Sequence, residues 1–202
     1  GTTVTTASAA HCQVAVALSG GRLVLLDVCS DGTLRQAAEA TMPQEVSSLC
    51  ITPLLPAAGA ARLVAAPSGG DASSAGHSRP VRVATLAAVG LWESNTVQLL
   101  RLPSLEPAGA PVTLSDEYQS RAAQLVTMDG VDRLFVGMGD GTLVHFVVDA
   151  AAGTLASRNV VQVGSRPITL DLHGGEGTPS PSQDEAAPSA SAGHTHVLVA
   201  GD

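Results

Sequence analysis

Two histidines separated by one residue, His194 and His196, have the spacing most suggestive of chemistry in this sequence. Residues two apart on a β-strand point to the same side, so this spacing could place two imidazoles together as metal ligands. A structural zinc site needs four ligands and a catalytic one needs three, and no cysteine or carboxylate cluster accompanies the pair. We therefore expect no metal site.

Two pairs of residues suggest parts of a catalytic triad, Ser8 with His11 and Asp140 with His145. Neither pair comes with a nucleophile elbow or with an oriented third member. The glycine-rich stretch Gly137–Gly141 leads into an apolar strand pattern. It therefore lacks the helix N-terminus that binds phosphate and is predicted to be a hairpin turn. We predict no catalytic residue, no bound cofactor and no enzyme activity.

The three cysteines are odd in number, and each lies within or at the end of an apolar run: Cys12, Cys29 and Cys50. Because free cysteine is among the most often buried residue types, free buried thiols are the simplest interpretation. Such thiols favour a reducing compartment over an oxidising one.

The composition indicates a folded protein with an acidic surface. Of the 202 residues, 45% are hydrophobic and 14% are charged, so the chain can bury a core. The net charge of −8 argues against a surface that binds duplex nucleic acid, because such a surface must be basic. No apolar run approaches the ~20 residues of a membrane span, and residues 1–20 lack a signal-peptide pattern. The chain starts without methionine, and we expect it to be part of a longer protein.

Short apolar runs bounded by Gly, Asp, Ser or Pro predict an all-β fold. No stretch keeps a helical pattern of apolar residues through three turns. The clearest of these runs are Val14–Leu18, Arg22–Val28 and Leu143–Val148.

A turn followed by a strand recurs along the chain. The unit at Gly20-Gly21 returns at Asp140-Gly141, an offset of 120 residues (141 − 21), and a third copy begins at Asn95, 46 residues before the last (141 − 95). A repeat of ~40 to 50 residues with several strands per copy is the signature of a β-propeller. We predict three four-stranded antiparallel blades and the start of a fourth.

The repeats suggest a map of the blades and of two insertions. One blade is expected at about 11–54, a second at about 62–115 and a third at about 121–173, with a fourth beginning at His194. The segments 66–80 and 174–193 are rich in Gly, Pro, Ser and Ala. Such segments cannot bury enough apolar surface to offset their ordering entropy, so we predict two disordered loops inserted in a single propeller.

Four blocks of sequence resemble one family of propeller scaffolds: Met42–Leu54, Ala87–Glu106, Leu134–Asp149 and Gly153–Leu170. In order and spacing they are similar to the family of damage-specific DNA-binding protein 1, the three-propeller adaptors of cullin-4 RING ubiquitin ligases. The resemblance covers nearly all of the chain outside the two insertions and corresponds to the latter part of the second propeller. It implies a non-catalytic scaffold that docks a cullin-4-type subunit, acts in protein ubiquitination and the DNA-damage response, and resides in nucleus and cytoplasm. The resemblance is compatible with an indirect association with nucleic acid through the full complex, leaves open whether DNA or RNA is contacted, and implies no membrane.

The resemblance also assigns two residues to the surface that meets the cullin, Glu45 and Trp92. A packing role for Trp92 at a blade edge and a solvated loop carboxylate at Glu45 remain open as alternatives. The insertion at 66–80 falls between these two residues in the sequence, which suggests that it lies close to the contact.

Two other functional classes stay open. Paralogues built on the same plan include the large cleavage and polyadenylation specificity subunit and a splicing factor 3b subunit, which are RNA-processing scaffolds. A propeller enzyme would instead place several Asp, Glu, His or Arg residues at strand ends near the central channel, and no such set is evident.

Overall fold

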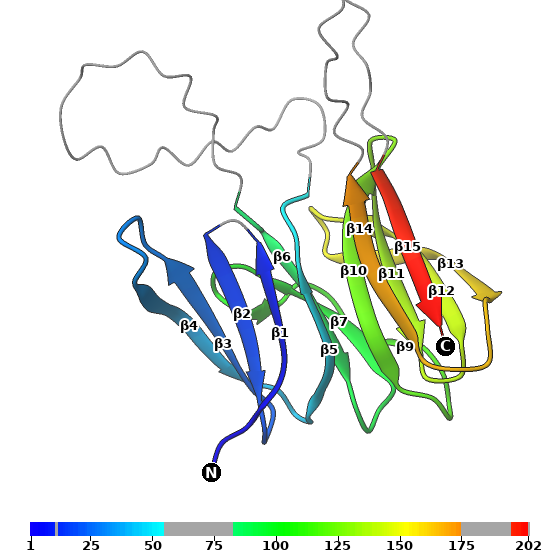
Figure 1. Ribbon diagram of the computed structural model, residues 1–202, viewed down its shortest axis with the longest axis horizontal. Coiled ribbons are helices and arrows are strands. Elements are labelled where there is room, and N and C mark those ends of the chain that lie inside the picture. The colour runs from blue at the N-terminus through cyan, green and yellow to red at the C-terminus, as the bar shows by residue number, and fades with distance from the viewer. Residues whose placement is uncertain (11, 55–82, 175–194, 202) are drawn as a thin grey trace, which may run out of the picture.

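The chain forms four antiparallel sheets placed side by side, and no helix occurs in the described residues (Figure 1). The computed structural model describes residues 1–10, 12–54, 83–174 and 195–201. The all-β architecture predicted from the short apolar runs is confirmed.

The first sheet is a meander of four strands in chain order, β1 (Val4–Ala10), β2 (Gln13–Leu18), β3 (Arg22–Val28) and β4 (Leu34–Thr41). The turn between β2 and β3 uses Gly20 and Gly21, whose φ angles are 80° and 74°. Glycine adopts such positive φ values at little cost. A Cβ at Gly21 would also lie only 2.7 Å from the carbonyl oxygens of Met42 and Gln44, so the link from β4 to the next sheet packs against this turn.

The second sheet contains β5 (Val46–Ile51), β6 (Leu86–Leu91), β7 (Thr96–Arg101), β8 (Glu106–Pro107) and β9 (Val112–Thr113). The two short strands both pair with β7, β8 at its end and β9 at its start. Together they take the place of a fourth strand. Proline has no backbone N–H to donate, and Pro107 and Pro111 interrupt this outermost position, where the missing donor is tolerated.

The third sheet repeats the meander and the fourth sheet has two strands. The third contains β10 (Ser120–Met128), β11 (Val131–Met138), β12 (Thr142–Asp149) and β13 (Thr154–Gln162). The fourth contains β14 (Ile168–Gly174) paired with β15 (Thr195–Gly201). Three sheets of the blade type and the beginning of a fourth are therefore present.

The first strands of the sheets lie next to one another: β1 contacts β5, β5 contacts β10, and β10 contacts β14 (Figure 1). This radial arrangement is that of propeller blades around an axis. A groove of about 480 Å³ runs along these four strands. One apolar cluster fills the space between the first and second sheets, with Leu23, Leu25 and Val89 fully buried. A second cluster, around Phe146, lies between the second and third sheets.

The predicted blade boundaries are wrong by one strand. Residues 46–51, expected in the first blade, pair with β6 of the second, and residues 168–173, expected in the third, form β14 of the fourth. The first blade gains Val4–Ala10, which the apolar pattern does not mark as a strand. A repeated hairpin gives the period of the blades. It leaves open whether a strand that lies between two hairpins in the sequence, such as 46–51, pairs with the hairpin before it or with the hairpin after it.

The two predicted insertions lie almost entirely outside the described residues. The segment 66–80 falls within 55–82, and 174–193 falls within 175–194 apart from Gly174, which ends β14. Whether these segments are disordered stays a prediction from composition.

Candidate docking surface

Glu45 and Trp92 lie side by side at one end of the second sheet. Glu45 is the last residue before β5, and Trp92 is the first residue after β6. These two strands are antiparallel with Val46 opposite Leu91, so the pairing places Glu45 next to Trp92. The backbone N–H of Trp92 donates a hydrogen bond to the carbonyl oxygen of Glu45, with an N···O distance of 2.9 Å. The two residues named by the family resemblance are thus direct neighbours.

The Trp92 side chain projects from the sheet into solvent, with 39% of its surface exposed. Its neighbour Leu91 is buried, like the rest of β6. The guanidinium carbon of Arg121, at the start of β10, lies 5.0 Å from the centroid of the indole ring. A cation held over an indole face at an exposed position stabilises the arrangement by about 0.5–1 kcal/mol. Arg121 therefore restrains the orientation of an exposed ring.

Hydrogen bonds connect the Trp92 turn to the link between β4 and β5, and connect that link to the β2–β3 turn. The Gln44 Oε1 atom accepts a hydrogen bond from the Ser94 backbone N–H at 2.9 Å. The Glu45 carboxylate is exposed, and its Oε1 atom accepts a hydrogen bond from the Gly20 N–H at 3.3 Å. This last contact joins the β2–β3 turn of the first sheet to the start of β5.

A buried group of serines beneath this surface brings β5, β6 and β10 together. The Ser120 hydroxyl lies 2.7 Å from the Ser47 hydroxyl and accepts a hydrogen bond from the Ser48 hydroxyl at 3.0 Å. Gly90 of β6 faces this group, and a Cβ at Gly90 would collide with the hydroxyl oxygens of Ser48 and Ser120. The absence of a side chain at Gly90 lets β10 approach closely, and Arg121 is the next residue after Ser120.

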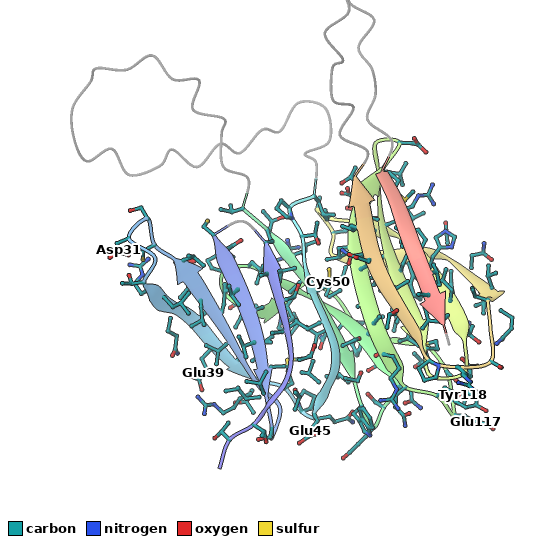
Figure 2. The ribbon with its side chains drawn as sticks, in the orientation of Figure 1. Asp31, Glu39, Glu45, Cys50, Glu117 and Tyr118 are labelled. Atoms are coloured by element: carbon teal, nitrogen blue, oxygen red, sulfur yellow. The ribbon has the colours of Figure 1, made fainter. Side chains whose placement is uncertain are left out.

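Two further residues were missed by sequence reasoning, Arg121, which lies against Trp92, and the exposed Tyr118, three residues before Arg121. Tyr118 is 44% exposed and lies in the loop that leads into β10. That loop is held on the Trp92 turn, because the Leu114 N–H donates to the Asn95 carbonyl oxygen at 2.9 Å. Neither residue stands at a repeated turn position, so periodicity gave no signal. The one available hint was that Tyr118 is the chain's single tyrosine. Figure 2 shows Glu45, Glu117 and Tyr118 along the same edge of the molecule.

The insertion at 66–80 is attached far from Glu45 and Trp92. The described chain leaves β5 towards Leu54 and returns through Val83 into β6, at the ends of these strands opposite to Glu45 and Trp92 (Figure 1). Six residues of β-strand span about 20 Å. The described ends of this segment are thus about 20 Å from Glu45 and Trp92, and the suggestion that the insertion itself lies close to the contact stays a prediction, because residues 66–80 fall outside the described residues.

The candidate catalytic pairs are engaged in structural roles or fall outside the described residues. The Asp140 carboxylate accepts hydrogen bonds from the N–H and hydroxyl of Thr142, which closes the hairpin turn. The His145 ring stacks on Phe135 with centroids 5.5 Å apart, and burial together with the nearby Arg133 charge lowers the pKa of His145. The Ser8 hydroxyl accepts a hydrogen bond from the Ile51 N–H at 3.0 Å, while His11 is not described.

The described residues contain no group of three or more side chains suited to hold a metal ion. His194 lies outside them. The groove along the four inner strands is lined mainly by small and apolar side chains, with Arg121 and Asp171 as its charged members. The described part of the chain thus brings no cluster of acids and bases to this groove.

All three cysteines are free thiols, as predicted, but only Cys50 is buried. Burial raises the pKa of the Cys50 thiol, and its sulfur accepts a hydrogen bond from the Leu125 N–H at 3.2 Å. Cys12 and Cys29 are partly exposed, so the expectation of burial is wrong for these two. Among the described residues, no helix is long and apolar enough to cross a membrane.

Comparison with known proteins identifies relatives over most of the chain. DNA damage-binding protein 1 of Oryza sativa subsp. japonica is 30% identical over 88% of this chain and 14% of its own length. DNA damage-binding proteins 1b and 1a of Arabidopsis thaliana are each 33% identical over 84% of this chain and 13% of their own length. The chain thus spans about one seventh of the length of these relatives.

Among solved structures, the β-propeller domain of Cps50 (Swd1) from Myceliophteria thermophila is similar, with a TM-score of 0.49 and 18% identity. The match covers 84% of this chain and 45% of that one.

A family model described as the RSE1/DDB1/CPSF1 second beta-propeller matches residues 1–178. This range includes Glu45, Trp92, Tyr118 and Arg121, together with the first three sheets and β14. The sheets, their radial order and this match agree: the chain belongs to the RSE1/DDB1/CPSF1 second beta-propeller family.

Proposed function

We propose that this propeller is the cullin-docking part of a non-catalytic ubiquitin-ligase adaptor, and that Glu45 and Trp92 contact a cullin-4-type subunit. The observation that carries the proposal is the exposed indole of Trp92, which is bonded through its backbone to Glu45 and held under the Arg121 guanidinium. Tryptophan is strongly enriched among the few residues that supply most of the binding energy at protein interfaces. A large aromatic side chain that is exposed and already oriented is therefore suited to serve as an anchor.

The family membership and the names of the relatives support the wider role. The plant relatives are named DNA damage-binding proteins, and the proposed adaptor acts in protein ubiquitination linked to the DNA-damage response. With a net charge of −8 the chain is poorly suited to bind nucleic acid directly, so the proposal places nucleic-acid contact in other parts of the complex. The expected location of the protein is the nucleus and the cytoplasm.

A second candidate is an RNA-processing scaffold. The description of the matched family names RSE1 and CPSF1 beside DDB1, so a role in cleavage and polyadenylation or in splicing fits the same propeller. Capture experiments separate the two roles, because the partners are different proteins. A propeller enzyme is less well supported, since the described groove residues offer only Arg121 and Asp171 as charged groups.

The proposal is tested by measuring the affinity of the full-length protein for the purified cullin-4-type subunit. We expect Trp92→Ala to weaken binding by about 2 kcal/mol, the threshold of an interface hot spot. Glu45→Ala is expected to act mainly on the association rate and its salt dependence, because an exposed charge at the rim steers encounter. Leu34→Ala is a matched control, since Leu34 is 60% exposed on β4 of the first sheet.

A thermal melt of each variant shows whether folding is preserved. Unchanged cullin binding by well-folded Trp92→Ala protein would remove this site. Failure of the wild type to bind the cullin, with capture of polyadenylation or splicing subunits instead, would favour the RNA-processing role.

A further inference from the structure

The outermost strands of the first three sheets differ in how well they are protected against pairing with another chain. In the first sheet, β4 carries Arg35 and Glu39, each in an ion pair with β3, and charged side chains discourage pairing at an edge. The outer position of the second sheet is interrupted by Pro107 and Pro111. In the third sheet, β13 has nine residues without a proline, and its one charged residue is Arg158. Of the three edges, β13 is therefore the least protected (Figure 1).

The second half of β13 and the residue after it expose an uncharged apolar surface. Val160, Val161 and Val163 are 47%, 49% and 50% exposed. Val160 and Val161 are consecutive in the strand, so their side chains point to opposite faces of the sheet. Valine favours the extended conformation, and half-exposed valines on both faces leave this end of the edge accessible to a further strand.

The free backbone groups of this edge follow from its pairing with β12. The Val163 N–H donates to the Gly141 carbonyl oxygen at 3.0 Å, and the register of the two strands continues from there without a shift as far as Val160. In an antiparallel pair, residues that exchange hydrogen bonds alternate with residues that do not. Val161 therefore bonds to β12, while the backbone N–H and C=O groups of Val160 and Gln162 point away from the sheet.

One of these outward groups is satisfied by the side chain next to it. The Val160 N–H donates to the Asn159 Oδ1 atom at 2.9 Å. Such a bond between a side chain and the adjacent backbone is local and needs no second strand. A partner strand can replace it, because the partner supplies a carbonyl oxygen in place of the Asn159 amide oxygen. Asn159 thus satisfies this part of the edge while the edge is unoccupied.

The charges along the edge are positive, although the chain as a whole is acidic. Between residues 150 and 170 the charged residues are Arg158 and Arg166, whereas the net charge of the chain is −8. Within the described residues neither arginine is in an ion pair, and Arg158 donates to a backbone carbonyl oxygen instead. The carboxylates at the two ends of β12, Asp140 and Asp149, accept hydrogen bonds from their own turns. An incoming strand with acidic ends is therefore complementary to this edge.

We infer that the outer edge of β13 binds an extended segment of a partner protein, which adds a strand to the third sheet. The segment is apolar at alternate positions and carries a carboxylate near each end, one for Arg158 and one for Arg166. In this mode of recognition, backbone hydrogen bonds, here to Val160 and Gln162, supply affinity, and the alternating side chains supply specificity. The inference does not rest on the proposed function, because β13 lies outside the candidate docking surface.

The test uses the full-length protein and a fluorescent synthetic peptide with the sequence Asp-Thr-Val-Thr-Val-Thr-Glu. We expect this peptide to bind, and a copy methylated at alternate backbone nitrogens to bind at least about 10-fold more weakly, because it lacks the donors for strand pairing. A copy with lysine in place of both acidic residues is expected to bind more weakly at low salt. The difference between the acidic and the lysine peptide should shrink at high salt, where exposed charges are screened.

Variants show whether the peptide binds at β13. Val160→Glu is expected to weaken binding about 10-fold or more, since it places a charge on the edge that repels the acidic peptide, and Val4→Glu on the first sheet is its control. Arg166→Gln is expected to weaken binding and to reduce its salt dependence, with Arg35→Gln on β4 as the control. Amide hydrogen exchange at Gln162 should slow when the peptide binds, because its outward N–H becomes bonded.

A wild-type protein that binds none of the acidic peptide at concentrations up to about 1 mM would overturn the inference. Equal binding of the methylated copy would overturn it as well, because strand pairing requires the backbone donors. A thermal melt shows whether each variant is folded. If Val160→Glu protein does not fold, the methylated peptide and the exchange rate at Gln162 in the wild type decide the question, and an unchanged exchange rate in the complex would place the peptide elsewhere.

Discussion

At the residue scale, the position of Trp92 is set by its neighbours. Its backbone is bonded to Glu45, its ring lies under Arg121, and Arg121 is held there because β10 packs closely on β6 at Gly90. The docking surface therefore depends on a glycine that lies beneath it. The buried serines Ser48 and Ser120 occupy the space that a side chain at Gly90 would need.

Gly90→Ala tests this dependence. The added methyl group meets two buried hydroxyl oxygens, so we expect a loss of about 1–3 kcal/mol in the free energy of unfolding, the usual cost of overpacking a core. Because β10 must shift, we also expect weaker cullin binding by folded Gly90→Ala protein. Denaturant unfolding and affinity measurements check both effects.

Gly130→Ala is the control for this substitution. A Cβ at Gly130 would meet no other atom within 4 Å, so the variant reports only the cost of a positive φ of 74°. A Gly90→Ala protein as stable as the wild type would show that β10 does not pack on β6 in this way.

At the element scale, the strand pair β5 and β6 separates the docking surface from the place where the chain leaves and re-enters the sheet, although the two are close in the sequence. Glu45 and Trp92 lie at one end of the pair, and the chain leaves and re-enters at the other end, through Leu54 and Val83. The polarity of the strands, rather than distance along the chain, decides what lies near the docking surface.

This arrangement predicts that the insertion is dispensable for docking. Replacing residues 66–80 with a short Gly/Ser linker should leave the affinity for the cullin-4-type subunit within about threefold, since the loop joins the sheet about 20 Å from Trp92. A large loss of affinity in a folded protein with the shortened loop would place the insertion at the contact after all.

The sequence predicted the elements better than their pairing. Short apolar runs and the glycine turns at Gly20-Gly21 and Asp140-Gly141 identified strands and hairpins, because these signals are local. The sheet that receives residues 46–51 could not be deduced, since β5 and β6 are joined across a long insertion. Arg121 was missed for a similar reason: its contact with the Trp92 ring crosses from one sheet to the next, and no repeat reports such a contact.

At the scale of the whole molecule, apolar clusters fill the spaces between the first and second sheets and between the second and third sheets. In the described part of the chain, the sheet faces outside these spaces are not covered in this way. Apolar side chains stay exposed on the first sheet and on the outer strand of the third, at Val4, Leu34, Val160 and Val161. Each sheet of a repeat architecture is stabilised by its neighbours, so sheets that lack a neighbour are weakly held.

We therefore expect residues 1–202 expressed alone to unfold without a sharp cooperative transition and to associate through their open faces and strand edges. Calorimetry and sedimentation of the isolated chain, compared with the full-length protein, provide the measurement. A sharp, reversible melt of an isolated monomer would contradict this account of how the sheets depend on one another.

The most direct test of the docking surface is site-specific photo-cross-linking in the full-length protein. A photoreactive phenylalanine at Glu93, in the same turn as Trp92, is compared with one at Asp31, in the β3–β4 turn at the opposite edge of the molecule (Figure 2). Both positions are exposed, and both substitutions leave Glu45 and Trp92 in place. We predict a cross-link to the cullin-4-type subunit from position 93 and none from position 31. A cross-link from position 31 without one from position 93 would contradict the account.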